Sequence, residues 1–236
     1  MRQEIFGHAS VRGAMHVKNG LPDQDACLVR KYKSGTLLVV SDGMGSRPHA
    51  EIGAQGVCRS VAKAVRLWQD SGCGDIRLLL PLIHSIWGLE VYPYPQSECG
   101  ATCLFAFLKN DGTLFLGQLG DGAIFYSVGK DRALFRQKED EFTNFTAGMS
   151  SIRSFQDWSL STVDIGEKPV KLCLMTDGVS ETLAAEKRWE FVHLLWKRIS
   201  EKETTRKRNY LVRRVLMDWP TIHTGDDRTV VSCEIR

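Results

Sequence analysis

Residues 38–43 read LVVSDG, an apolar strand that stops at an aspartate and a glycine. The pattern returns as LGQLGDG at residues 116–122 and as LCLMTDG at residues 172–178. Aspartate is poor inside strands and Asp-Gly is a common turn dipeptide, so each copy alone predicts only a strand followed by a turn. The repetition predicts more: several carboxylates that each stand at the end of a buried strand.

Two further carboxylates stand directly before strands. Asp25 precedes the apolar segment 26–31, and Asp226 precedes the closing segment 228–234. Carboxylates that converge on the same sheet edges repel one another unless a cation neutralises them. Hard divalent ions prefer oxygen ligands, which indicates Mg²⁺ or Mn²⁺. Zinc is not indicated, because His and Cys do not occur at ligand spacing.

A pair of such ions about 3.5–4 Å apart would polarise a bridging water into a nucleophile and neutralise a phosphoryl group. The strand-end carboxylates therefore indicate phosphoester hydrolysis before any family is considered. Other chemistries have little support in the sequence. The glycines of residues 117–122 lack nucleotide-binding spacing, and neither a Walker sequence nor a nucleophile elbow is present.

Short apolar segments between turn residues predict strands at 26–31, 36–41, 102–108, 113–119, 123–128, 157–165, 170–176 and 228–234. Apolar residues at helical spacing predict helices at 50–69, 76–90, 181–200 and 209–217. The helices come as pairs, and the middle strands are joined by tight turns such as residues 110–112. This order favours an α+β fold in which two antiparallel sheets are flanked by helical pairs, as α/β/β/α layers in one domain spanning 1–236.

The composition mainly argues against certain classes of protein. A net charge of +3 over 236 residues does not indicate nucleic acid or membrane binding, and the basic residues between 197 and 214 are interpreted as a solvated helical face. The polar N-terminus does not resemble a signal peptide, and no apolar run is long enough to cross a bilayer. Seven scattered cysteines without a CxxC pair predict free, mostly buried thiols, a reducing compartment and a cytoplasmic protein.

Six motifs, in order, resemble those of the PPM/PP2C metal-dependent protein phosphatases. They are DQDA at 23–26, SDGMG at 41–45, GAT at 100–102, GDG at 120–122, TDG at 176–178 and DDRT at 226–229. Each motif is weak alone, whereas six in the family's order are specific. The short serine-containing loop that follows the second motif looks like that of a compact bacterial subgroup. The resemblance also implies the family's two-sheet sandwich flanked by helical pairs.

The resemblance implies metal ligands by position. Asp42 would bridge two Mn²⁺ or Mg²⁺ ions, with the Gly43 carbonyl completing the shell of one of them. Asp177 and Asp226 would hold the second ion. Asp121 would belong, with Asp177, to the third-ion site of some family members.

The resemblance also implies catalytic residues, and here the chain departs from the family pattern. Asp25 would bind metal-coordinated water. His16 occupies the place of an arginine that grips the substrate phosphate, with Arg12 as a competing candidate. Met44 stands where long members carry a histidine that acts as general acid, so metal-bound water or His49 would have to serve.

The implied activity is hydrolysis of phosphoserine and phosphothreonine in protein substrates by a monomeric enzyme, with a Ser/Thr kinase acting in opposition. The alternative is a regulatory module of the same shape without turnover, which the departures at His16 and Met44 keep open. The segment 142–156 stands where the family has a variable flap, and is either a substrate-selecting element or an ordinary surface loop.

Overall fold

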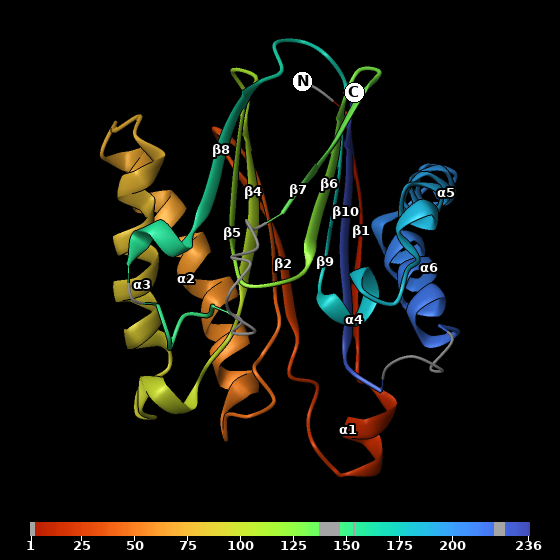
Figure 1. Ribbon diagram of the computed structural model, residues 1–236. Helices are drawn as coiled ribbons and strands as arrows, with labels where there is room; N and C mark the ends of the chain where they lie inside the picture. Colours follow the sequence, from red (N-terminus) through yellow and green to blue (C-terminus); the bar gives the residue numbers. More distant parts are fainter. Residues whose placement is uncertain (1–2, 137–146, 153, 220–224) are drawn as a thin grey trace.

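Two five-stranded antiparallel sheets lie face to face at the centre of the protein (Figure 1). The computed structural model describes residues 3–136, 147–152, 154–219 and 225–236. One sheet has the order β1 (Glu4–Val11), β10 (Arg228–Ile235), β9 (Val170–Met175), β6 (Ala123–Val128) and β7 (Asp131–Phe135). The other has the order β2 (Ala26–Tyr32), β3 (Gly35–Ser41), β4 (Cys103–Lys109), β5 (Thr113–Leu119) and β8 (Ser159–Asp164).

Helical pairs cover the outer faces of both sheets, which confirms the predicted α+β layers (Figure 1). The pair on the β2–β8 sheet is α2 (Ala50–Asp70) and α3 (Leu79–Glu90), and the pair on the β1–β7 sheet is α5 (Arg188–Ser200) and α6 (Thr205–Met217). Two short helices, α1 (Ala14–Lys18) and α4 (Asp177–Ser180), lie at one end of the sheets. Single 3₁₀ turns are η1 (Ile76–Leu78), η2 (Gln96–Glu98), η3 (Phe155–Asp157) and η4 (Ala185–Lys187).

Apolar side chains fill each of the spaces between the layers. In β3, Leu38 and Val40 face the opposite sheet, whereas Leu37 and Val39 face α2 and α3. A strand that is buried on both faces must be apolar at every position, which explains the unbroken run that precedes Asp42. A third cluster, which includes Trp196, packs α5 and α6 onto the β1–β7 sheet.

The structure differs from the sequence-based elements in several places. β1 and β7 were not predicted: β1 contains Gly7 and His8, and its pairing with β10 over all of its residues outweighs weak strand propensity. The helix predicted at 181–200 is interrupted, because the chain turns between α4 and Arg188 before α5 begins. The last helix starts earlier than predicted, after Thr204, whose side chain caps it by accepting a hydrogen bond from the Lys207 N–H.

Three predictions from composition can be compared with the described residues. All seven cysteines are free thiols, and five of them are buried. No helix among the described ranges is both long enough and apolar enough to cross a membrane. The basic residues of α5 and α6 are largely exposed, as expected for a solvated face.

Candidate metal centre

Strand register brings two of the predicted carboxylates to one end of the β2–β8 sheet. β2 and β3 are antiparallel, and Ala26 at the start of one pairs with Ser41 at the end of the other. Asp25 directly precedes this pair and Asp42 directly follows it, so both lie at the same sheet edge.

The second sheet presents its carboxylates at the same end of the sandwich. Met175, the last residue of β9, pairs with the first residues of β6 and with β10 close to its start. Asp177 therefore lies beside the β5–β6 turn, which carries Asp121, and beside the segment before β10, which carries Asp226. Figure 1 shows this end of the sandwich at the bottom, next to α1 and α4.

Side chains from the two sheets meet at this end. Carboxylate oxygens of Asp42, Asp121 and Asp177 lie within 4.8 Å of one another, close enough to ligate one metal ion. Asp226 lies near enough for its charge to raise the pKa of both Asp42 and Asp177. The fold thus brings three of the four aspartates predicted as metal ligands within ligating distance of one another, and it places Asp226 close enough for its charge to affect two of them.

Glycine conformation places Asp121. The residue stands between Gly120 and Gly122, whose φ angles of +92° and +98° lie in the left-handed region that favours glycine. A Cβ on Gly122 would come within 2.7 Å of the Met175 carbonyl oxygen. The GDG sequence is therefore needed both for the turn and for its close approach to the end of β9.

Backbone hydrogen bonds hold the Asp42 loop. The Asp42 N–H donates to the Thr102 hydroxyl at 2.9 Å, and the Thr102 N–H donates to the Asp42 carbonyl at 2.8 Å. The Gly43 N–H donates to the Gln24 carbonyl at 3.0 Å. Within the described residues no donor bonds the Gly43 carbonyl oxygen, which leaves that oxygen available as a ligand.

The cluster is electrostatically costly without a cation. Burial raises the pKa of Asp42 well above its ordinary value, and the negative charges of Asp25 and Asp177 raise it further. Burial also raises the pKa of Asp177 to about 6; a hydrogen bond with Asp42 lowers it, while the charge of Asp121 raises it. Half-buried oxygen ligands whose repulsion a divalent ion would remove fit Mn²⁺ or Mg²⁺.

Asp25 lies beside the cluster and is more deeply buried. Burial raises its pKa well above the ordinary value, against hydrogen bonds that lower it. The Thr176 hydroxyl donates to Asp25 Oδ2 at 2.8 Å, whereas Oδ1 is buried and has no hydrogen-bond partner among the residues that the structure describes. An orphaned buried carboxylate oxygen next to three further carboxylates fits a site built to contain a cation or its coordinated water.

His16 and Arg12, the two candidates for the phosphate contact, have different surroundings. His16 Nδ1 lies 2.8 Å from Asp227 Oδ2, and its side chain is 14% exposed. Arg12 is exposed and donates from Nη1 to the Leu21 carbonyl oxygen at 3.0 Å, which closes the loop after α1. His16 is thus held by a buried carboxylate, whereas Arg12 is tied to the loop after α1.

The other residues of the loop after Asp42 are placed as follows. The Met44 side chain packs against Gly100 and Gly148. His49 stacks on Tyr94 with ring centroids 4.0 Å apart, which fits an ordinary packing role. The predicted flap at 142–156 falls partly outside the described residues, so it stays a prediction.

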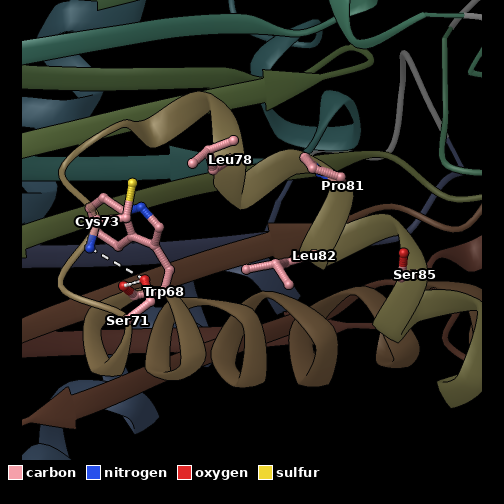
Figure 2. Close-up of a pocket in the computed structure, with 7 residues that line it drawn as sticks. All are labelled: Trp68, Ser71, Cys73, Leu78, Pro81, Leu82 and Ser85. Atoms are coloured by element: carbon pink, nitrogen blue, oxygen red, sulfur yellow. Dashed lines mark hydrogen bonds between the residues drawn. The ribbon is translucent and has the colours of Figure 1, made fainter.

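A separate apolar depression lies between α2 and α3 (Figure 2). Its volume is about 340 Å³, and its lining includes Trp68, Cys73 and Leu82. It lies near the C-terminal end of α2, whereas Asp42 comes just before the N-terminal end of that helix. It carries no carboxylate in its lining, and it is distinct from the candidate metal centre.

Comparison with known families accounts for this arrangement. The family model described as protein phosphatase 2C matches residues 12–217, most of the chain. The chain belongs to the protein phosphatase 2C family. Asp226 lies beyond the matched residues. A comparison with curated protein sequences gives no match.

Solved structures show the same fold at low identity. The photosystem II phosphatase PBCP is 15% identical, with 99% of each chain covered and a TM-score of 0.68. The catalytic domain of the serine/threonine phosphatase PstP, in complex with two manganese ions, is 17% identical, with 99% of each chain covered and a TM-score of 0.64. RsbX in complex with magnesium is 13% identical, with 100% of each chain covered and a TM-score of 0.63.

Sequence reasoning missed two residues that support the site. Thr176 was seen only as part of the TDG motif, yet it bonds Asp25. Asp227 was seen only as the second residue of DDRT, yet its carboxylate is buried and holds three donors. The signal for Asp227 was present: a carboxylate stands where the family motif has asparagine.

Proposed function

We propose that this PP2C protein is a metal-dependent serine/threonine phosphatase that hydrolyses phosphoserine and phosphothreonine in protein substrates. The observation that carries the proposal is the convergence of Asp42, Asp121 and Asp177 within 4.8 Å, with Asp226 beside them. These residues lie far apart in the chain, and gathering them as carboxylates costs electrostatic free energy that a bound cation offsets.

In this proposal the ions would be held by Asp42, the Gly43 carbonyl, Asp121, Asp177 and Asp226. Bound Mn²⁺ or Mg²⁺ supplies the positive charge that activates water and neutralises the phosphoryl group. The carboxylates fix the positions of the ions, and their burial keeps competing water away from the reacting centre.

Two residues act beside the ligands. Asp25 holds water at the centre through the oxygen that has no protein partner, while Thr176 fixes the orientation of its carboxyl group. His16 binds the substrate phosphate through Nε2, the ring nitrogen that faces away from Asp227. A histidine bonds phosphate through one N–H, whereas an arginine forms two, so substrate affinity is expected to be modest.

The direct test is hydrolysis of an aryl phosphate and of a panel of phosphoserine, phosphothreonine and phosphotyrosine peptides, with and without Mn²⁺ or Mg²⁺. We expect hydrolysis of the aryl phosphate only with metal and, among the peptides, metal-dependent hydrolysis of phosphoserine and phosphothreonine alone. Asp42→Asn and Asp177→Asn should abolish it. Metal-independent hydrolysis, or full activity in both variants, would rule the proposal out.

A further inference from the structure

Asp227 is the most heavily bonded carboxylate at this end of the sandwich. Its side chain is 1% exposed. Oδ1 accepts the Gly13 N–H at 2.6 Å, and Oδ2 accepts the Gln24 N–H at 2.6 Å. His16 Nδ1 reaches the same Oδ2 at 2.8 Å. Three donors from three points of the N-terminal segment therefore converge on one buried carboxylate.

This environment requires a carboxylate, and an amide cannot replace it. An asparagine has one oxygen and one NH₂ group, and each of the two positions at Asp227 faces a donor. Whichever way the amide is turned, its NH₂ group would meet the N–H of Gly13 or of Gln24. A buried donor without an acceptor costs about 1–3 kcal/mol.

Asp227 is hydrogen-bonded both to His16, the proposed phosphate-binding residue, and to Asp226, a proposed metal ligand. Its own N–H donates to Asp226 Oδ1 at 2.8 Å. The preceding residue, Gly225, accepts the Met15 N–H at 2.9 Å, so α1 lies directly on the segment that carries Asp226. Gln24, bonded to Asp227 through its N–H, bonds through its carbonyl to the Gly43 N–H.

The hydrogen bond also sets the state of the His16 ring. A carboxylate can only accept, so Nδ1 carries a proton and donates it to Asp227. Nε2 is then the free edge of the ring, and no hydrogen bond links it to any other described residue. Without Asp227, the ring would lose the acceptor that fixes its orientation and could adopt either tautomer.

We propose that Asp227 is a positioning residue for phosphate binding: it fixes the tautomer and direction of His16 so that Nε2 is presented to the substrate phosphate. The proposal rests on the proposed phosphatase function and extends it to a residue that touches no substrate. In this proposal His16, oriented by Asp227, binds the phosphate in place of the arginine of the family pattern. The carboxylate of Asp227 is the hydrogen-bond acceptor for His16 and for the backbone N–H groups of Gly13 and Gln24.

A double-mutant cycle at saturating Mn²⁺ tests the proposal. Asp227→Asn and His16→Gln are each expected to lower kcat/KM for an aryl phosphate about 10–100-fold, mostly through KM. Both should weaken inhibition by inorganic phosphate by a similar factor. In the His16→Gln background, Asp227→Asn should cost less than a third of what it costs in the unaltered protein, because its main target has gone.

Nitrogen-15 spectra of the histidine rings, recorded on the Mg²⁺-loaded full chain, give a readout without turnover. The His16 signals are assigned by their loss in His16→Gln. We expect the neutral ring to carry its proton on Nδ1 in the unaltered protein and to lose this preference in Asp227→Asn. A proton on Nε2 in the unaltered protein overturns the proposal, even if Asp227→Asn fails to fold.

Asp111→Asn is the control, since Asp111 lies in the β4–β5 turn at the opposite end of the sandwich, where it bonds Lys109 and Thr113. Its effect should add to that of His16→Gln and leave the ring signals unchanged. If Asp227→Asn behaves in the same additive way, Asp227 is only structural and the proposal fails. An unaltered protein without metal-dependent hydrolysis overturns the proposed function instead, which is a different result.

Discussion

The chain contains the same dipeptide, Asp-Gly, at opposite ends of the sandwich, with opposite physical character. Asp111-Gly112 forms the β4–β5 turn at the top of Figure 1, where Asp111 is exposed. Slight burial raises the pKa of Asp111, but hydrogen bonds from Lys109 and Thr113 outweigh it and hold the pKa below its ordinary value. Asp42-Gly43 ends β3 at the other side, where the largest effects on Asp42 are burial and neighbouring carboxylates, and its pKa is raised.

The difference shows what distinguishes a turn from a metal ligand. Asp111 is exposed and forms an ion pair, with Lys109 Nζ 2.5 Å from its Oδ2. The charges that bear most on Asp42 are those of other aspartates. A buried carboxylate surrounded by like charge persists in a fold only when something compensates it, and a bound ion does so.

The largest expected effect is on the rate of hydrolysis. Asp42→Asn should lower metal-dependent hydrolysis about 10³-fold, because the ions supply several kcal/mol of charge stabilisation and each 1.4 kcal/mol is about tenfold. Asp111→Asn makes the same substitution in the β4–β5 turn at the opposite end of the sandwich, and it should leave kcat/KM unchanged. Steady-state rates of the two variants give the comparison, and equal losses would refute the distinction between the two ends.

Asp25→Asn should have the next largest effect. The amide keeps an acceptor for the Thr176 hydroxyl but loses the charge that holds coordinated water, so kcat should fall about 10–100-fold. Circular dichroism and thermal unfolding check that the fold persists. An unchanged kcat would remove Asp25 from the proposed site.

The affinity of the candidate metal centre for Mn²⁺ should depend on pH. The pKa of Asp177 is raised to about 6, so its proton must leave before an ion binds. Mn²⁺ affinity should therefore fall about tenfold for each pH unit below about 6. Calorimetric titrations in two buffers with different ionisation enthalpies measure the affinity and count the released protons; a pH-independent affinity contradicts the assignment.

The smallest effect concerns stability without metal. Because the folded pKa of Asp177 lies near 6 and its ordinary value is 3.8, the folded state binds more protons than the unfolded state between these values. Its contribution to the free energy of unfolding therefore decreases as pH rises through that window. The pKa of Asp111 is lowered in the folded state, so its contribution to the free energy of unfolding increases as pH rises.

Asp177→Asn should accordingly stabilise the metal-free protein by up to about 3 kcal/mol at pH 7, and should flatten its stability between pH 4 and 6. Lys109→Ala, which removes the partner of Asp111, should destabilise it by less than about 1 kcal/mol, as is usual for exposed ion pairs. Urea unfolding with a chelator present measures both changes. Destabilisation by Asp177→Asn would mean that the carboxylates do not repel one another.

The strand-end carboxylates, most strands and the two helical pairs could be predicted from the sequence. They could be predicted because period, turn residues and apolar runs are local signals: residues 37–40 of β3 are all apolar because the strand is buried on both sides. β1 carries too weak a local signal, since Gly7 and His8 break the pattern, and only its pairing with β10 makes it a strand.

Which carboxylates come together, and which side chains support them, follows from tertiary packing. Asp226 and Asp227 are neighbours in sequence, yet the first lies close enough to affect the charge of Asp42 while the second accepts three donors from the N-terminal segment. The chain bends at Asp226 just before β10, so what each of the two side chains meets depends on which distant segments pack there. That information lies in long-range contacts, and no local pattern contains it.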